Sequence, residues 1–237
     1  MTKPKTVLVV PDVHFPWPHK SALRELKRTV IPALKPTHIV QLGDLLDLYG
    51  LSKFSKDPTR GLTLKQEVAL GREFVSEMQD SCGFYLQCEG NHSARLSKRL
   101  QDEPDLSSTH PSLRELLGVP EKNWCAYHTH YAIGRVLFTH DVGYAGAHAA
   151  QQTLMAMQAC CVFGHTHRAS IVYGGDLKND RYVCMNPGWL GDASACDYLP
   201  EAKKRDWQVA CGVVDYSPSG HVHMQILPFV NGRFLGT

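Results

Sequence analysis

The chain carries five short apolar runs, and each one ends at a cluster of polar residues. In chain order the runs are residues 6–10, 38–42, 84–88, 135–139 and 160–163. Runs of this length and composition, bounded by turn residues, predict buried β-strands. The polar residues that follow them are Asp12 and His14, Asp44 and Asp47, Asn91 and His92, His140 and Asp141, and His165 and His167. Since the ends of neighbouring strands meet at one edge of a sheet, we expect these side chains to converge.

Helical spacing of apolar residues separates several of these runs. Residues 21–30 follow such a spacing, with Ser21 placed to cap a helix, so the chain is expected to begin with a β-α-β unit whose two strands are parallel neighbours. Residues 62–79 predict a long helix before the third strand. Residues 112–117 predict a short helix that is closed by Gly118, and residues 146–159 predict a helix before the fifth strand.

The second half of the chain has the pattern of strands joined by turns. Residues 124–133 are expected to form a hairpin with 135–139, turning at Gly134. Further strands are expected at 170–173, 181–185, 209–216 and 221–227, with a strong hairpin signal at 217–220. We therefore predict a mixed α/β (α+β) fold, a two-sheet β-sandwich flanked by helices. The five clusters must converge, so we expect one domain over residues 1–237.

Composition narrows the classes of protein. The 237 residues are 43% apolar, enough to bury a sizeable core. A net charge of +2, from 25 basic and 23 acidic residues, argues against a strongly electropositive coat but leaves room for a local basic groove. The N-terminal apolar run is too short for a signal peptide, and no apolar stretch approaches the ~20 residues of a membrane helix, so we expect a cytoplasmic protein with no membrane partner.

The eight cysteines show no CxxC spacing. We interpret them as buried thiols of a reducing cytosol, with a disulfide framework or a zinc knuckle as the alternative.

The polar clusters contain the ligand types of a transition-metal site. Asp12 and His14 place a hard oxygen and a borderline nitrogen in one loop, which suits a divalent cation. Asp44 follows Gly43, which allows a tight turn, and a carboxylate there could bridge two cations. The full set of candidate ligands is Asp12, His14, Asp44, Asn91, His140, His165 and His167. Any one of these, alone, is better explained as a cap or turn residue; the ordered set indicates a dinuclear metal site. Cysteine is absent from the clusters, which argues against structural zinc.

These motifs resemble one known family. Asp12-x-His14, Gly43-Asp44-x-x-Asp47, Gly90-Asn91-His92, His140 and Gly164-His165-x-His167 look like the calcineurin-like metallophosphoesterase superfamily. They span residues 12–167, about two thirds of the chain, and Asn186-Pro187-Gly188 resembles the late Asn-Pro-Gly turn of that family. The resemblance implies a two-sheet sandwich with two divalent metal ions, Mn, Fe or Zn, at one edge.

The resemblance also assigns roles. It implies Asp12, His14, Asp44 and His167 on one metal, and Asp44, Asn91, His140 and His165 on the other. It further implies that His92 acts on the leaving group and is held by Asp47. The chemistry agrees: two bridged cations lower the pKa of a shared water to give hydroxide, which attacks phosphorus in line, while His92 protonates the leaving group as general acid.

The motifs also favour one kind of substrate. Leu48-Tyr49 and Glu89 stand where the serine/threonine protein phosphatase branch has Arg-Gly and Arg, so we disfavour that branch. The sequence is nearer the diesterase and nuclease branches, and we expect a phosphoester substrate, DNA or RNA among the candidates. Phosphomonoester hydrolysis on small molecules or phosphoproteins is the alternative. Trp17, Tyr49, Phe54 and Trp189 could line a base-stacking surface or simply pack in the core.

Three further points bear on the site. Arg95 is our candidate phosphate contact, with a solvated helix face as the alternative. Ser93 stands where many relatives have an acidic residue, which puts in doubt a supporting hydrogen bond but no ligand. A non-catalytic scaffold of the same fold, like one retromer subunit of the superfamily, would have lost ligands or His92, whereas all are present. A metal-dependent amide or ester hydrolase is a further alternative.

Overall fold

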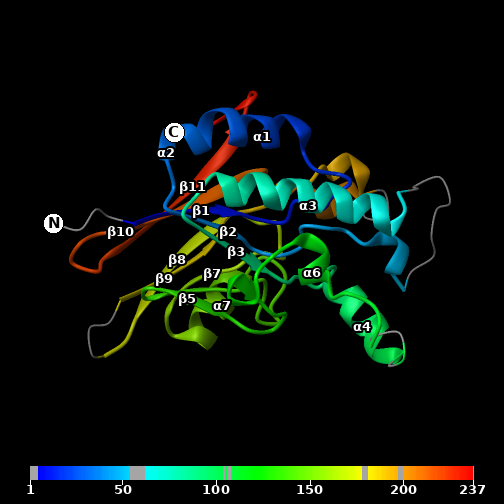
Figure 1. Ribbon diagram of the computed structural model, residues 1–237. Coiled ribbons are helices and arrows are strands. Elements are labelled where there is room, and N and C mark those ends of the chain that lie inside the picture. The colour runs from blue at the N-terminus through cyan, green and yellow to red at the C-terminus, as the bar shows by residue number, and fades with distance from the viewer. Residues whose placement is uncertain are drawn as a thin grey trace.

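Two mixed β-sheets pack face to face, and helices cover the outer face of each (Figure 1). The computed structural model describes residues 5–53, 62–103, 105, 108–177, 181–196 and 200–236. The architecture is the helix-flanked two-sheet sandwich that the sequence predicts.

The first sheet has seven strands in the order β12-β11-β10-β1-β2-β3-β4. They are β1 (Lys5–Val10), β2 (His38–Gln41), β3 (Phe84–Cys88), β4 (Trp124–Cys125), β10 (Ala210–Tyr216), β11 (Val222–Val230) and β12 (Arg233–Phe234). The strands β1 to β4 are parallel, with Val7 opposite His38 and His38 opposite Phe84. The expected β-α-β start is therefore confirmed, and so is the hairpin between β10 and β11.

The second sheet has five strands in the order β5-β6-β7-β9-β8. They are β5 (Tyr131–Ile133), β6 (Val136–Phe138), β7 (Cys160–Val162), β8 (Ser170–Gly175) and β9 (Arg181–Asn186). The expected hairpin that turns at Gly134 is confirmed by β5 and β6. The segment 124–133, however, is not one strand. Its start forms β4 in the first sheet, and its end forms β5 in the second, so this segment passes from one sheet to the other.

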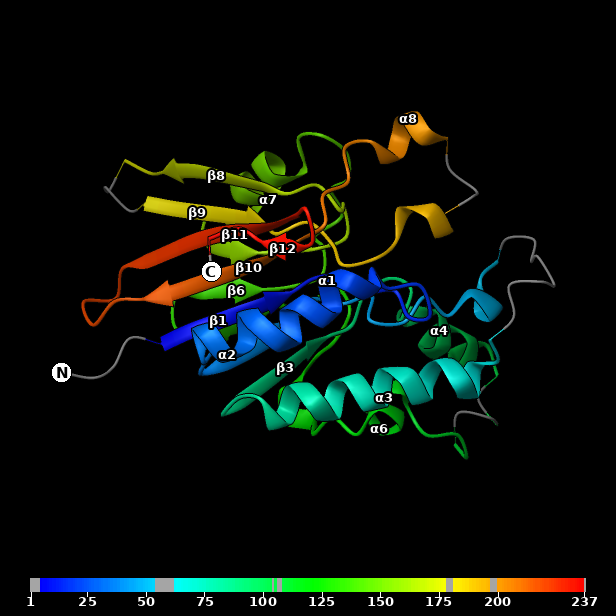
Figure 2. The ribbon, with the colours of Figure 1, turned by 90° about the horizontal axis from the view of Figure 1, so that it is seen from above.

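Helices lie on the outer faces. Their bounds are α1 (Lys20–Glu25), η1 (Leu26–Val30), α2 (Ile31–Leu34), α3 (Leu64–Asp80), α4 (Ala94–Asp102), α6 (Leu113–Leu117), α7 (Ala149–Met157) and α8 (Glu201–Lys204), with short turns at η2 (Tyr49–Leu51), η3 (Glu121–Asn123) and η4 (Ala193–Ala195). The expected cap at Ser21 is wrong, because the His19 side chain accepts the Ala22 N–H instead. Figure 2 looks down on α1, α2 and α3 where they cross the first sheet.

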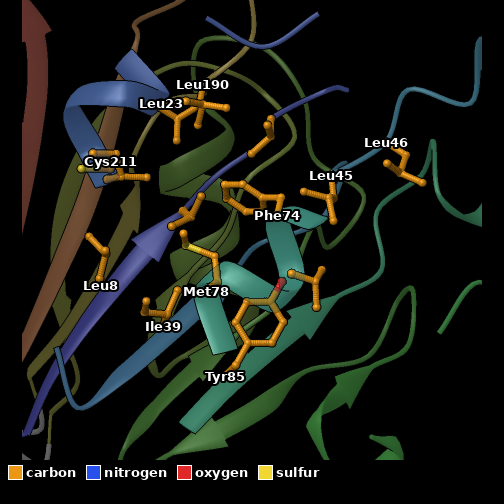
Figure 3. Close-up of a cluster of buried hydrophobic side chains, with 14 of the residues drawn as sticks. Leu8, Leu23, Ile39, Leu45, Leu46, Phe74, Met78, Tyr85, Leu190 and Cys211 are labelled. Atoms are coloured by element: carbon orange, nitrogen blue, oxygen red, sulfur yellow. The ribbon is translucent and has the colours of Figure 1, made fainter. Parts of the chain in front are cut away.

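Strand alternation fixes the core. In β1, Leu8 and Val10 face the helices, whereas Val7 and Val9 lie between the two sheets. Figure 3 shows the helix side, where Phe74 and Met78 of α3 pack over the first sheet. A third cluster joins α7 to the outer face of the second sheet. Because β1 is buried on both faces, the position at which it ends is tightly held.

The structure also gives the state of the cysteines and the length of the helices. All eight cysteines are free thiols, six of them buried. Within the described ranges, no helix has both the length and the apolarity needed to cross a bilayer.

Candidate metal centre

The ends of the strands deliver all seven expected ligands to one cluster. Two groups of donor atoms stand out, and in each group the atoms lie within 4.8 Å of one another. The first group is Asp12, His14 and His167, and the second is Asp44, His140 and His165. The first group lacks only Asp44 of the first ligand set that the family resemblance implies, and Asn91 joins the second group through its contacts to His140 and His165. A third group of donor atoms, from His14, Asp44 and His92, lies between these two.

The first group brings two imidazole nitrogens into contact. His14 Nε2 lies 3.2 Å from His167 Nε2, which in turn lies 3.7 Å from Asp12 Oδ1. Two ring nitrogens and a carboxylate that converge in this way form a donor set that suits a divalent transition-metal ion. His167 Nδ1 is buried without a hydrogen-bond partner among the described residues.

The second group is tied together by Asn91. The Asn91 Oδ1 atom lies 3.0 Å from His140 Nε2 and 2.8 Å from His165 Nδ1. His140 Nε2 is also 3.3 Å from Asp44 Oδ2. The other ring nitrogen, His140 Nδ1, lies 2.8 Å from the Leu42 carbonyl and donates to it, which directs Nε2 toward the cluster.

Asp44 lies where the two groups meet. Its carboxylate is within 4.8 Å of donor atoms of His14 and His92, as well as belonging to the second group. One oxygen accepts the His92 backbone N–H at 2.9 Å. Of the seven candidate ligands, Asp44 is thus placed to be shared between two cations.

The pKa values of the two buried carboxylates, Asp12 and Asp44, are shifted in opposite directions. Burial raises the pKa of Asp12 to about 8, despite the nearby His140. Burial works against ionisation of Asp44 as well, but His140 and His92 hold the pKa of that carboxyl well below its ordinary value. Burial opposes the charge of His140 too, yet Asp44 raises its pKa to about 10. Asp12 therefore lacks a sufficient positive partner in the protein, which fits a carboxylate that ligates a cation.

Asp47 contacts His92, as the sequence predicts, and it also contacts His14. Asp47 Oδ1 lies 2.8 Å from His92 Nδ1 and 3.4 Å from His14 Nδ1. Burial opposes ionisation of Asp47, but the hydrogen bonds from His14 and His92 lower its pKa. Both imidazoles therefore donate from Nδ1 to one carboxylate, which leaves both Nε2 atoms for the site.

Carboxylates from other motifs leave no room for a side chain at two of the motif glycines. A Cβ at Gly90 would collide with the Asp44 carboxylate, and one at Gly164 would lie 2.5 Å from Asp12 Oδ2. Each glycine thus makes room for a ligand from another motif. The ligand loops also turn sharply: of the ten described non-glycine residues with positive φ, five are the candidate ligands Asp12, His14, Asp44, His165 and His167.

Sequence reasoning missed three supporting residues. Gln41 holds Gly43 through hydrogen bonds to its N–H and carbonyl, at 2.8 and 2.7 Å. Asn186 donates to the Gly164 carbonyl at 2.7 Å and so fixes the loop of His165, a role hinted at only by the Asn-Pro-Gly turn. Glu67 of α3 accepts the Leu48 N–H beside Asp47. A glutamate on the apolar face of a helix was the signal that could have found it.

The remaining candidates lie around the centre. Arg95 Nη1 donates to the Asp47 carbonyl at 2.7 Å, and its role as a phosphate contact stays a prediction. Trp17, Tyr49 and Trp189 line a pocket beside the first group, whereas Phe54 lies outside the described residues. Trp207, which sequence reasoning did not single out, lines the same pocket.

Comparisons with known proteins give little beyond this geometry. No protein-family model and no curated protein matches the chain. Among solved structures, the chain is similar to Chaetomium thermophilum Vps29, with 10% sequence identity over 95% of this chain and 98% of that one and a TM-score of 0.43. So distant a likeness says nothing about activity, and any function must be argued from the site.

Replacing Gly90 by Ala should displace Asp44 and disturb both ligand groups. We expect bound divalent metal, measured by elemental analysis, to fall well below that of the parent protein while the far-ultraviolet circular dichroism is kept. Gly50→Ala is the control, because a Cβ there meets nothing within 4 Å. Full metal content in Gly90→Ala would show that the close approach to Asp44 is not needed.

Glu67 should make stability depend on pH. Burial raises its pKa from 4.5 to about 7, so between these values the folded state binds more protons than the unfolded one. The free energy of unfolding should therefore fall as pH rises through this window, by about 3 kcal/mol at most. Urea unfolding at pH 5 and pH 8 should show a smaller fall for Glu67→Gln. Glu73→Gln, exposed on the same helix, should keep the fall; equal slopes in all three proteins would contradict the assignment.

Proposed function

We propose that this chain is a dinuclear metal-dependent phosphoesterase that cleaves phosphodiester bonds of nucleic acid or nucleotides. The observation that carries the proposal is the position of Asp44 between two groups of buried nitrogen and oxygen donors. Structural metal sites are usually closed and mononuclear, whereas paired sites with a shared carboxylate serve hydrolysis.

The protein groups divide the chemistry between them. Asp12, His14, Asp44 and His167 would hold one divalent ion, and Asp44, Asn91, His140 and His165 the other. Bound there, the two ions would supply the Lewis acidity that ionises a water and neutralises the phosphoryl oxygens. His92, with a proton on each ring nitrogen, would donate the Nε2 proton to the departing oxygen and keep its Nδ1–H on Asp47, at 2.8 Å. Asp47 keeps His92 in the required tautomer and orientation.

The surroundings favour a diester over a small monoester. Arg95, Lys98 and Arg99 of α4 line a groove that reaches Asn91 in the second donor group. Cations in a groove that leads to the reacting phosphate suit a chain with further phosphates on either side. In Figure 1, α4 extends away from the body of the sandwich, so such a chain could pass along it.

The proposed activity is tested with bis-p-nitrophenyl phosphate and p-nitrophenyl phosphate, with added Mn²⁺ and after chelation. We expect metal-dependent turnover, faster on the diester. Asp44→Asn should lose more activity than any other single ligand change and should reduce metal content at both positions. Asp80→Asn, an exposed change at the end of α3, is the control. Near-normal turnover with two metals in Asp44→Asn would rule out the shared position.

His92→Asn should lower kcat by about 10²–10⁴-fold, the usual contribution of a positioned general acid. Metal content should stay intact. The loss should be smaller for p-nitrophenyl esters, whose leaving group needs no proton, than for alkyl or nucleoside esters. Asp47→Asn should give a milder form of the same pattern. Equal losses for good and poor leaving groups, or loss of a metal, would move His92 out of this role.

A further inference from the structure

A pocket opens beside the first donor group, and aromatic rings form much of its wall. Trp17, Tyr49, Trp189 and Trp207 line it together with His14, His92 and His167. Its cavity volume is only about 90 Å³, so it has room for a small flat group and not for a whole nucleotide. The imidazoles of the metal centre thus form one wall of an aromatic pocket.

The rings form a group of three and a separate pair. Trp189 is buried and stacks on His167 with centroids 4.4 Å apart, and Trp207 meets both of these rings edge-on, at 4.8 Å and 4.5 Å. Trp17 meets Tyr49 edge-on at 5.9 Å. Trp189 is largely covered, as core packing would require. Trp17, Tyr49 and Trp207 are only partly buried, and all three line the pocket.

The charges of the pocket restrict what can enter. Its described lining includes no Lys or Arg, but it does include the carboxylates of Asp47 and Asp192. Hydrogen bonds from Ser194 to the Asp192 carboxylate, at 2.9 and 2.7 Å, hold the pKa of Asp192 below its ordinary value. An ionised carboxylate repels a second phosphate and accepts hydrogen bonds from N–H groups. The pocket therefore suits a flat, uncharged ring that carries N–H donors.

The cations lie elsewhere, on the groove formed by Arg95, Lys98 and Arg99 beside Asn91. Aromatic and basic surfaces thus adjoin different donor groups of the same centre. A nucleotide chain has this division of chemistry, with flat bases on one side and phosphates along the backbone.

We propose that the pocket lined by Trp17, Tyr49 and Trp207 binds the nucleobase next to the scissile phosphodiester. This inference rests on the proposed phosphodiesterase function and makes the substrate class a nucleotide with an exposed base, as in single-stranded nucleic acid or a dinucleotide. Trp17 and Trp207 are its specificity-determining residues, and Asp192 accepts an N–H of the base.

Binding of the base is tested without metal or catalysis. Saturation-transfer NMR on the metal-free protein should show contact to the ring protons of adenosine, which has no phosphate. The signal should be largely lost in Trp17→Ala, and kept in Trp17→Phe and in the control Tyr173→Ala, which changes an exposed ring on β8 outside the pocket. No contact in the parent protein, or an unchanged signal in Trp17→Ala, would overturn the proposal.

The second arm measures kcat/KM with Mn²⁺ on a dinucleotide and on the same diester lacking both bases. The parent protein should prefer the dinucleotide, and Trp17→Ala should reduce that preference by roughly 5- to 150-fold, the range of base–aromatic stacking. Trp17→Phe should restore most of it. An unchanged preference, or faster hydrolysis of phosphotyrosine than of the dinucleotide, would overturn the proposal. Adenosine binding that depends on Trp17 in a protein that hydrolyses no phosphoester would support the pocket and refute the proposed function.

Discussion

Two carboxylates, Asp12 and Asp44, are buried near each other at the point where the strand ends meet, and burial opposes the ionisation of both. Moving ionised groups out of water costs several kcal/mol each unless positive partners replace the lost solvation. For Asp44 the protein supplies such partners in His140 and His92. For Asp12 it does not, as its raised pKa shows. Divalent cations bound at this cluster would supply the positive charge that the protein does not.

The rest of the fold holds these carboxylates where they are. Strands buried on both faces cannot slide without exposing a row of apolar side chains, so the loop that follows each strand begins at a fixed position. Gly90 and Gly164 let loops from different strands approach within contact of Asp44 and Asp12. Behind the ligands, Gln41 and Asn186 hold the same loops through buried hydrogen bonds. The precision of the site comes from these interlocked loops rather than from any single element.

Much of this could be predicted from the sequence because the signals are local. A short apolar run followed by Asp or His gives both a strand and its ligand, and α3 and α6 carry clear caps. What could not be predicted depends on tertiary packing. No local pattern shows that residues 124–133 divide between two sheets, because either pairing satisfies the same apolar alternation. Trp207 comes 40 residues after His167 in the sequence, and only the fold places its ring against that imidazole. The sequence places Glu67 on the apolar face of a helix, but it does not show the partner, which is a backbone amide from another segment.

The left-handed backbone at five of the ligands determines how mutations there affect the stability of the protein. A non-glycine residue held at positive φ raises the free energy of the folded chain by about 1–3 kcal/mol. Glycine at these positions would relieve that strain but would remove the ligand. A mutation that replaces such a ligand by glycine can therefore stabilise the folded protein while it removes a donor group from the centre. Keeping a ligand at these positions therefore costs stability that glycine would restore.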